Sequence, residues 1–126
     1  MTIHPQLQLV FDAFDERVPG TPVAIVGSAV RDFEQAHDID VLVPQTVNWP
    51  VLMRRLGTKY NGWGKPGHHV RRANLRIEGV SKQVQVLQRD ESPTFASHPH
   101  AVLLPSGEVL NGNAHFQKST PTFPRR

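Results

Sequence analysis

Apolar residues recur along this chain with two different spacings, and each spacing predicts a different kind of element. Between residues 5 and 18 they fall mostly three or four positions apart, which predicts an amphipathic helix. These side chains are Leu7, Val10, Phe11, Phe14 and Val18. A second helix is predicted over residues 49–56, with Pro50 near its start and Gly57 just after its end.

Shorter apolar runs predict the strands that lie between these helices. Residues 23–26 are wholly apolar and are typical of a buried strand. Residues 38–43 predict a second strand, closed by Pro44. The stretch between the two strands, residues 29–36, is expected to form a short helix with Ser28 as its N-cap.

Two hairpins are expected in the second half of the chain. Residues 70–78 and 83–88 alternate between apolar and polar side chains and are joined by a short turn that contains glycine. Residues 101–104 and 108–110 flank Pro105-Ser106-Gly107 and predict a second, smaller hairpin.

The order of these elements predicts an α/β (α+β) domain. We expect a small mixed sheet of about four or five strands with helices packed on one face. Residues 1–116 are interpreted as a single domain, and residues 117–126 as a loose C-terminal tail with little apolar content.

Composition narrows the classes of function only a little. The chain has 126 residues, of which 38% are hydrophobic and 20% charged, as in ordinary soluble proteins. It contains no cysteine, no apolar run long enough to span a membrane and no N-terminal signal pattern, so a cytoplasmic protein without a membrane partner is predicted. The net charge of +3 is compatible with a polyanionic partner but does not require one.

The clearest chemical signal is a pair of acids one residue apart. Alternate residues of a strand face the same side, so Asp38 and Asp40 project together, with Ile39 on the opposite face. Two adjacent carboxylates favour a hard divalent cation such as Mg²⁺. Upstream, Gly27 and Ser28 stand where the backbone N–H groups of a turn suit a phosphate. Each feature also has a simpler interpretation. Asp38 and Asp40 could lie on the solvated face of an edge strand, and Gly27 and Ser28 could form only a tight strand-to-helix turn.

This segment resembles the signature of the polymerase-β-like nucleotidyltransferase superfamily. The resemblance is carried by Val26-Gly27-Ser28, a spacer of nine residues, and Asp38-Ile39-Asp40-Val41. A further stretch is similar to the Gly-Gly-x-Val-Arg-Asp segment of CCA-adding enzymes and bacterial poly(A) polymerases; it reads Gly27-Ser28-Ala29-Val30-Arg31-Asp32.

The resemblance implies a metal-dependent transfer of a nucleoside monophosphate from an NTP to a hydroxyl, with release of pyrophosphate. The acceptor would be RNA, a small molecule or a protein. Asp38 and Asp40 would bind Mg²⁺ or Mn²⁺, and Gly27 and Ser28 would hold the phosphates with help from Arg31.

One position departs from the superfamily pattern. A third carboxylate is expected on the strand over residues 83–88, where this chain has the neutral Gln85. Glu78 is the nearest acidic replacement. Two hypotheses about the chain therefore remain. It is a slow or one-metal enzyme, or it is a degenerate module that binds nucleotide, nucleic acid or a protein without turnover.

Basic and histidine residues add weaker signals. The loop over residues 59–69 includes Lys65, and Arg71 and Arg72 follow it, so these cations are candidates to contact an acceptor or nucleic acid. The same segment is equally consistent with a solvated hairpin tip. A third alternative function is a small basic RNA-binding protein. The histidines match no standard zinc spacing and are interpreted as surface residues, although His37 directly precedes Asp38.

Overall fold

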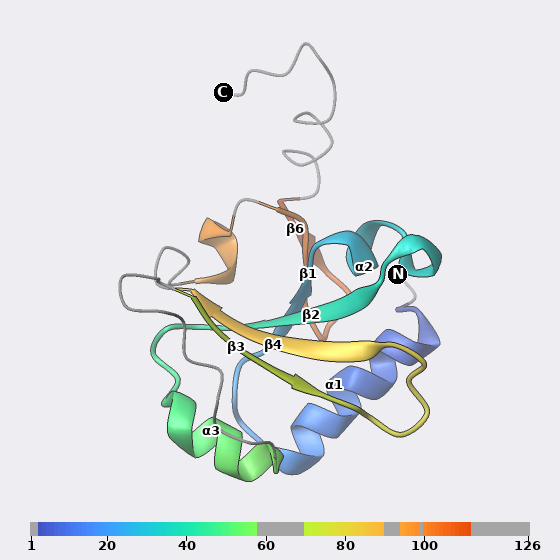
Figure 1. Cartoon of the computed structure of the whole chain (residues 1–126). Helices are drawn as coiled ribbons and strands as arrows, with labels where there is room; N and C mark the ends of the chain where they lie inside the picture. The colour runs from blue at the N-terminus through green and yellow to red at the C-terminus, as the bar shows by residue number, and fades with distance from the viewer. Residues whose placement is uncertain (1–2, 58–69, 90–93, 99, 112–126) are drawn as a thin grey trace.

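The computed structural model describes residues 3–57, 70–89, 94–98 and 100–111 (Figure 1). Within these residues the chain forms a mixed α+β fold with three α-helices and a six-stranded sheet. In chain order the elements are α1 (Pro5–Arg17), β1 (Ala24–Val26), α2 (Ser28–Arg31), the 3-10 helix η1 (Phe33–Gln35), β2 (Asp38–Val43), α3 (Trp49–Leu56), β3 (Val70–Leu75), β4 (Gln83–Arg89), the 3-10 helix η2 (Phe95–Ser97), β5 (Val102–Leu103) and β6 (Val109–Leu110).

The sheet has the strand order β3-β4-β2-β1-β5-β6. Its strands β2 and β4 are parallel, and every other neighbouring pair is antiparallel. The mixed sheet and both hairpins are therefore confirmed, with six strands rather than four or five because the small second hairpin joins the same sheet. Since β2 lies between β1 and β4, the strand that carries both acids is hydrogen-bonded along both edges.

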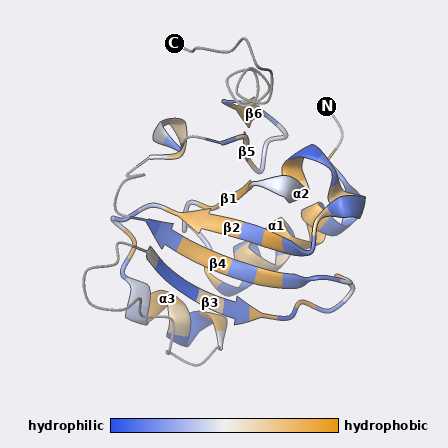
Figure 2. Ribbon diagram, turned by 45° about the horizontal axis from the view of Figure 1, so that its top comes forward, coloured by the Kyte–Doolittle hydropathy of each residue, from blue (hydrophilic) through white to orange (hydrophobic). Residues whose placement is uncertain are grey.

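The main core lies between one face of the sheet and the helices α1 and α3 (Figure 1). Alternation puts Ile39, Val41 and Val43 of β2 into this core, and Figure 2 shows the matching alternation of hydrophilic and hydrophobic residues along β4. Both predicted helices form. Local chemistry fixes their ends: Asn48 Oδ1 accepts from Val51 N at 3.1 Å, and Gly57 ends α3 in the left-handed conformation.

The other face of the sheet is divided into two halves. Around β1 it is apolar, and a second buried cluster forms there from Ala24, Val26, Leu42, Leu87 and Val102. Phe95 of η2, Leu104 and Leu110 pack against this cluster. The prediction that helices pack on only one face of the sheet is therefore not fully met, because the 3-10 helix η2 covers part of the second face. Toward the start of β2 the same face carries polar residues instead, as described below.

Two predicted elements differ from the structure by more than two residues. The prediction of one helix over residues 29–36 is wrong. The helix α2 ends at Arg31, because the next residue, Asp32, adopts an extended conformation. Its N-cap is Gly27 rather than Ser28, which is already the first helical residue. The chain then forms η1, which turns Phe33 into the core. The strand expected over residues 70–78 ends at Leu75.

Other sequence-based expectations cannot be compared with the structure. The loop over residues 59–69, which includes Lys65, and the tail over residues 117–126 lie outside the described residues. Among the described helices, none combines the length and apolar character that crossing a membrane requires.

Candidate functional site

Asp38 and Asp40 lie side by side on the polar half of the second face. The burial of β2 alternates as the sequence predicts: Asp38 is exposed, Ile39 is completely buried in the main core, and Asp40 is half-buried. Asp40 is paired with β1 and β4, and Asp38 with β4, so the backbone of the sheet holds both carboxylates in position. The strand thus presents two anionic groups toward one small volume.

The glycine turn comes next to this pair of acids. Val26, the last residue of β1, is aligned with Asp40, so the chain turns at Gly27 directly beside that carboxylate. Gly27 has φ 85° and ψ −149°, a conformation that is essentially restricted to glycine. A Cβ at this position would lie 3.5 Å from Asp40 Oδ2. The missing side chain therefore keeps the space between the turn and the acid open.

Gln85 faces Asp40 from the neighbouring strand. The two residues are partners in the β2–β4 register, and Asp38 is aligned with Gln83 one step earlier. The Gln85 Nε2 donates to Asn74 Oδ1 of β3 at 3.2 Å. The residue at which the resemblance implies a third carboxylate is thus aligned with Asp40 and has a neutral amide in a hydrogen bond.

The electrostatics of the site concentrate on Asp40. Burial raises the pKa of this carboxyl, and the neighbouring Asp38 raises it further, while Arg72 opposes both effects. Burial and a like charge each disfavour the ionised form. A divalent cation between the two acids would offset this penalty, since it would add positive charge to the partial compensation from Arg72.

The predicted cations do not all gather at this site. Arg72 acts electrostatically on Asp40 and lies on the same face of the sheet, aligned with Leu87. Its neighbour Arg71 bonds Gln88 on the opposite face, because adjacent residues of a strand point to opposite sides. The two arginines predicted as acceptor contacts therefore lie on opposite faces of the sheet, and their contact with an acceptor stays a prediction. Arg31 and Ser28 are exposed at the two ends of α2.

The described residues contain no group of three or more His, Asp or Glu side chains arranged to hold a metal ion. Asp38 and Asp40 therefore supply two carboxylates, and further ligands would have to come from water or from a bound polyphosphate. That arrangement suits Mg²⁺, which keeps several waters and commonly takes one or two carboxylates plus substrate phosphates.

Lys82 is a residue of the site region that the sequence pattern did not indicate. Its Nζ donates to the backbone carbonyl oxygens of Phe33, Glu34 and Ala36, and it lies 4.5 Å from the centroid of the Phe33 ring. These carbonyls belong to the segment between the glycine turn and Asp38. One half-buried ammonium group thus fixes that segment to the start of β4. The only signal in the sequence is a lysine after a turn, which is usually solvated.

We expect Lys82→Met to lower the free energy of unfolding by about 2 kcal/mol, because several carbonyls lose a charged donor. Urea denaturation followed by circular dichroism measures the loss. Arg76→Met removes a charge from an exposed position just after β3 and is the matched control. Equal stability of the two variants would contradict a structural role for the Lys82 ammonium.

Comparisons with protein-family models, with curated proteins and with solved structures found no match to this chain.

Proposed function

We propose that this chain is a minimal metal-dependent nucleotidyltransferase, which transfers an NMP from an NTP to a hydroxyl acceptor and releases pyrophosphate. One observation carries the proposal: two carboxylates on a doubly paired strand lie beside a glycine turn that leaves open space at Asp40. The closeness of two carboxylates and the backbone of a turn supports the proposal, because a metal bound to a polyphosphate needs both. The resemblance of residues 23–43 to the polymerase-β-like superfamily points to the same chemistry.

In this proposal, Asp38 and Asp40 hold Mg²⁺ or Mn²⁺ at the polar half of the sheet. The bound metal offsets phosphate charge and stabilises the attacking and leaving oxygens of an in-line displacement. The backbone at Gly27 and Ser28 contacts the polyphosphate through close approach, since α2 has only four residues and adds little helix dipole. Arg31 and Arg72 supply positive charge, and Gln85 offers a neutral amide at the third position.

The direct test is a titration of the full chain with Mn²⁺, followed by electron paramagnetic resonance, with and without non-hydrolysable analogues of each of the four common NTPs. Nucleotide binding that requires the metal supports the proposal, and the preferred analogue identifies the base. Transfer of label from an α-³²P NTP to RNA, to the chain itself or to small alcohols then identifies the acceptor class. If no analogue binds in the presence of Mn²⁺, the proposal is wrong.

A second candidate function is a module of the same fold that binds nucleotide, nucleic acid or a protein partner without turnover. The neutral Gln85 beside Asp40 favours it, because the loss of an anionic ligand weakens a metal site. A general RNA-binding role is distinguishable from both, since its affinity would fall steeply with salt and would not respond to Mg²⁺.

Gln85→Asp separates a weakened catalyst from a binding module. We expect a third carboxylate in this position to tighten Mn²⁺ binding by about tenfold, because ligand charge sets the affinity of such sites. If the chain is a weakened enzyme, its transfer rate rises as well. Gln35→Asp introduces the same charge at an exposed position of η1 and is the control. Tighter metal binding without any transfer would support the module, and unchanged metal affinity would argue against a metal site at Asp40.

A further inference from the structure

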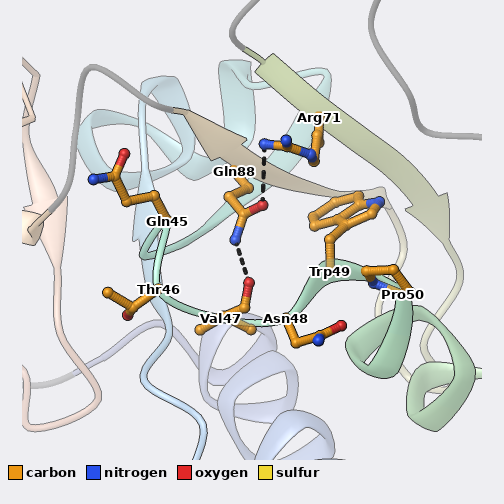
Figure 3. A pocket seen from close by; sticks show the side chains of 8 residues that line it. All are labelled: Gln45, Thr46, Val47, Asn48, Trp49, Pro50, Arg71 and Gln88. Carbon is orange, nitrogen blue, oxygen red and sulfur yellow. Dashed lines mark hydrogen bonds between the residues drawn. The ribbon is translucent and has the colours of Figure 1, made fainter.

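Two glutamines of β4, Gln85 and Gln88, have amides in different surroundings. Gln88 is 2% exposed and faces the side of the sheet that carries α1 and α3. Its Nε2 donates to the carbonyl oxygens of Pro44 at 2.9 Å and Val47 at 2.8 Å, and its Oε1 accepts from Arg71 Nη1 at 3.4 Å. Figure 3 shows this amide between the guanidinium and the turn after β2. Both ends of the Gln88 amide are thus in hydrogen bonds, as is usual for a buried amide.

Gln85, on the opposite face of the same strand, has only its nitrogen in a hydrogen bond. Its Nε2 donates to Asn74 Oδ1 of β3 at 3.2 Å. Within the described part of the chain, its Oε1 accepts no hydrogen bond. Because β4 lies between β3 and β2, an amide whose nitrogen bonds β3 has its oxygen turned away from β3. The aligned residue on the other side is Asp40 of β2.

The carboxylate of Asp40 also lacks a hydrogen-bond donor among the described residues. Arg72 acts on it electrostatically without forming an ion pair. A glutamine amide aligned with a carboxylate is well placed to donate to it, but the Gln85 nitrogen bonds Asn74 instead. Acceptor oxygens of a carboxylate and of a neutral amide therefore lie side by side, and within the described residues no donor joins them. A hard divalent cation is the group that binds such oxygens together.

We propose that Gln85 Oε1 is the third protein ligand of a single divalent cation held by Asp38 and Asp40, and that Asn74 is the positioning residue that turns this oxygen toward the metal. The inference rests on the proposed function and adds to it the third ligand and the residue that orients it. Hard cations accept amide carbonyl oxygens as well as carboxylates. Two carboxylates balance the charge of one divalent cation, so the site takes one metal ion.

Asn74 fulfils this role without binding the metal itself. It is aligned with Gln85, which is aligned with Asp40, so the three side chains form one row across three neighbouring strands. At the usual spacing of strands, Asn74 stands about 10 Å from Asp40, too far to share a metal ion with it. Its bond to Nε2 prevents the Gln85 amide from rotating and donating to Asp40 in place of the cation. Bonds of this kind commonly orient the ligands of a metal.

The test is a titration of the full chain with Mn²⁺, without nucleotide, followed by electron paramagnetic resonance. Gln85→Met removes the amide, and Asn74→Leu removes its acceptor at an exposed position. Each should weaken Mn²⁺ binding about tenfold. The double variant should bind Mn²⁺ no more weakly than Gln85→Met alone, because Asn74 acts only through Gln85. A merely structural effect of Asn74 would persist in the double variant.

Gln83→Met is the matched control. Gln83 lies on the same strand and the same face, aligned with Asp38, but within the described residues its amide forms no hydrogen bond that would hold it. Its substitution should leave the affinity for Mn²⁺ unchanged. An equal loss in this variant would overturn the proposal, because an amide without a positioning partner would then serve as well.

Three further outcomes would overturn the proposal. They are unchanged affinity in both single variants, additive losses in the double variant, and tighter Mn²⁺ binding by Gln85→Met, which would mean that the amide competes with the cation for Asp40. Because Asn74 is exposed, its variant tests the proposal even if Gln85→Met fails to fold. Failure of the proposed function is distinguishable, since the unaltered chain would then bind Mn²⁺ but no NTP analogue. A chain that binds no Mn²⁺ would overturn both.

Discussion

Asp40→Asn is expected to lower the rate of nucleotide transfer by at least about a thousandfold. The substitution keeps the size of the side chain and removes one of the two proposed anionic metal ligands, and metal stabilisation of the transition state is worth several kcal/mol. Transfer of label from an α-³²P NTP in the presence of Mg²⁺ measures the loss. Asp15→Asn, at an exposed position of α1, removes the same charge and should leave the rate unchanged.

The same substitution should raise stability while it removes activity. Because burial and Asp38 raise the pKa of Asp40, the ionised carboxylate costs folding free energy at neutral pH. Asp40→Asn should therefore increase the free energy of unfolding at pH 7, by about 0.5 kcal/mol for a group that is half exposed.

The dependence of this gain on pH provides its own check. A carboxyl with a raised folded-state pKa favours folding at low pH, and this contribution is lost as the pH rises through that pKa. The stability difference between Asp40→Asn and the unaltered chain should therefore shrink as the pH falls toward 4. Thermal denaturation between pH 4 and 7 without metal follows it. A variant that is less stable at pH 7, or one that retains full transfer, would contradict the assigned role of Asp40.

Gly27→Ala should reduce both stability and nucleotide binding. The positive φ of 85° with ψ −149° is strained for any residue with a Cβ, which lowers the free energy of unfolding by about 2 kcal/mol. The added methyl would also stand 3.5 Å from Asp40 Oδ2, in the space proposed for a phosphate. We expect the affinity for an NTP analogue with Mn²⁺ to fall at least about tenfold, since direct backbone contact is blocked.

Gly20→Ala distinguishes these two effects. Gly20 also has a positive φ, 82°, but a Cβ there would meet nothing within 4 Å. Both variants should therefore lose stability in urea denaturation, while only Gly27→Ala loses nucleotide affinity. If Gly20→Ala weakens the nucleotide equally, strain alone explains the result and the turn has no part in binding.

The parts of the fold that were predicted best from the sequence are those whose bounds depend on residues within or directly beside the element. The strand at residues 38–43 has the bounds of β2, because the apolar residues after the two acids are buried on both faces of the sheet and Pro44 follows the last of them. The helix at residues 49–56 coincides with α3, since Asn48 and Gly57 carry the cap chemistry that defines its ends. The side-by-side placement of Asp38 and Asp40 follows from the same alternation.

The parts that the sequence did not predict depend on contacts between distant residues. Nothing local shows that Lys82 would bond the carbonyls of Phe33 and Ala36, which lie more than 40 positions earlier. The buried amide of Gln88 depends on a turn that precedes it by a similar distance. Arg71 and Arg72 were grouped because they are neighbours in sequence, although the pleat of a strand separates them.

The segment after residue 94 adds two strands to the sheet and covers part of its second face. β5 pairs with the free side of β1, and Phe95, Leu104 and Leu110 cover the apolar cluster around Ala24 and Val26. A fragment that stopped before Val102 would turn β1 into an open edge with unpaired amides and uncovered apolar side chains. Such an edge is a template for self-association. We therefore expect a fragment that ends before Val102 to self-associate, although it contains the acids and the glycine turn.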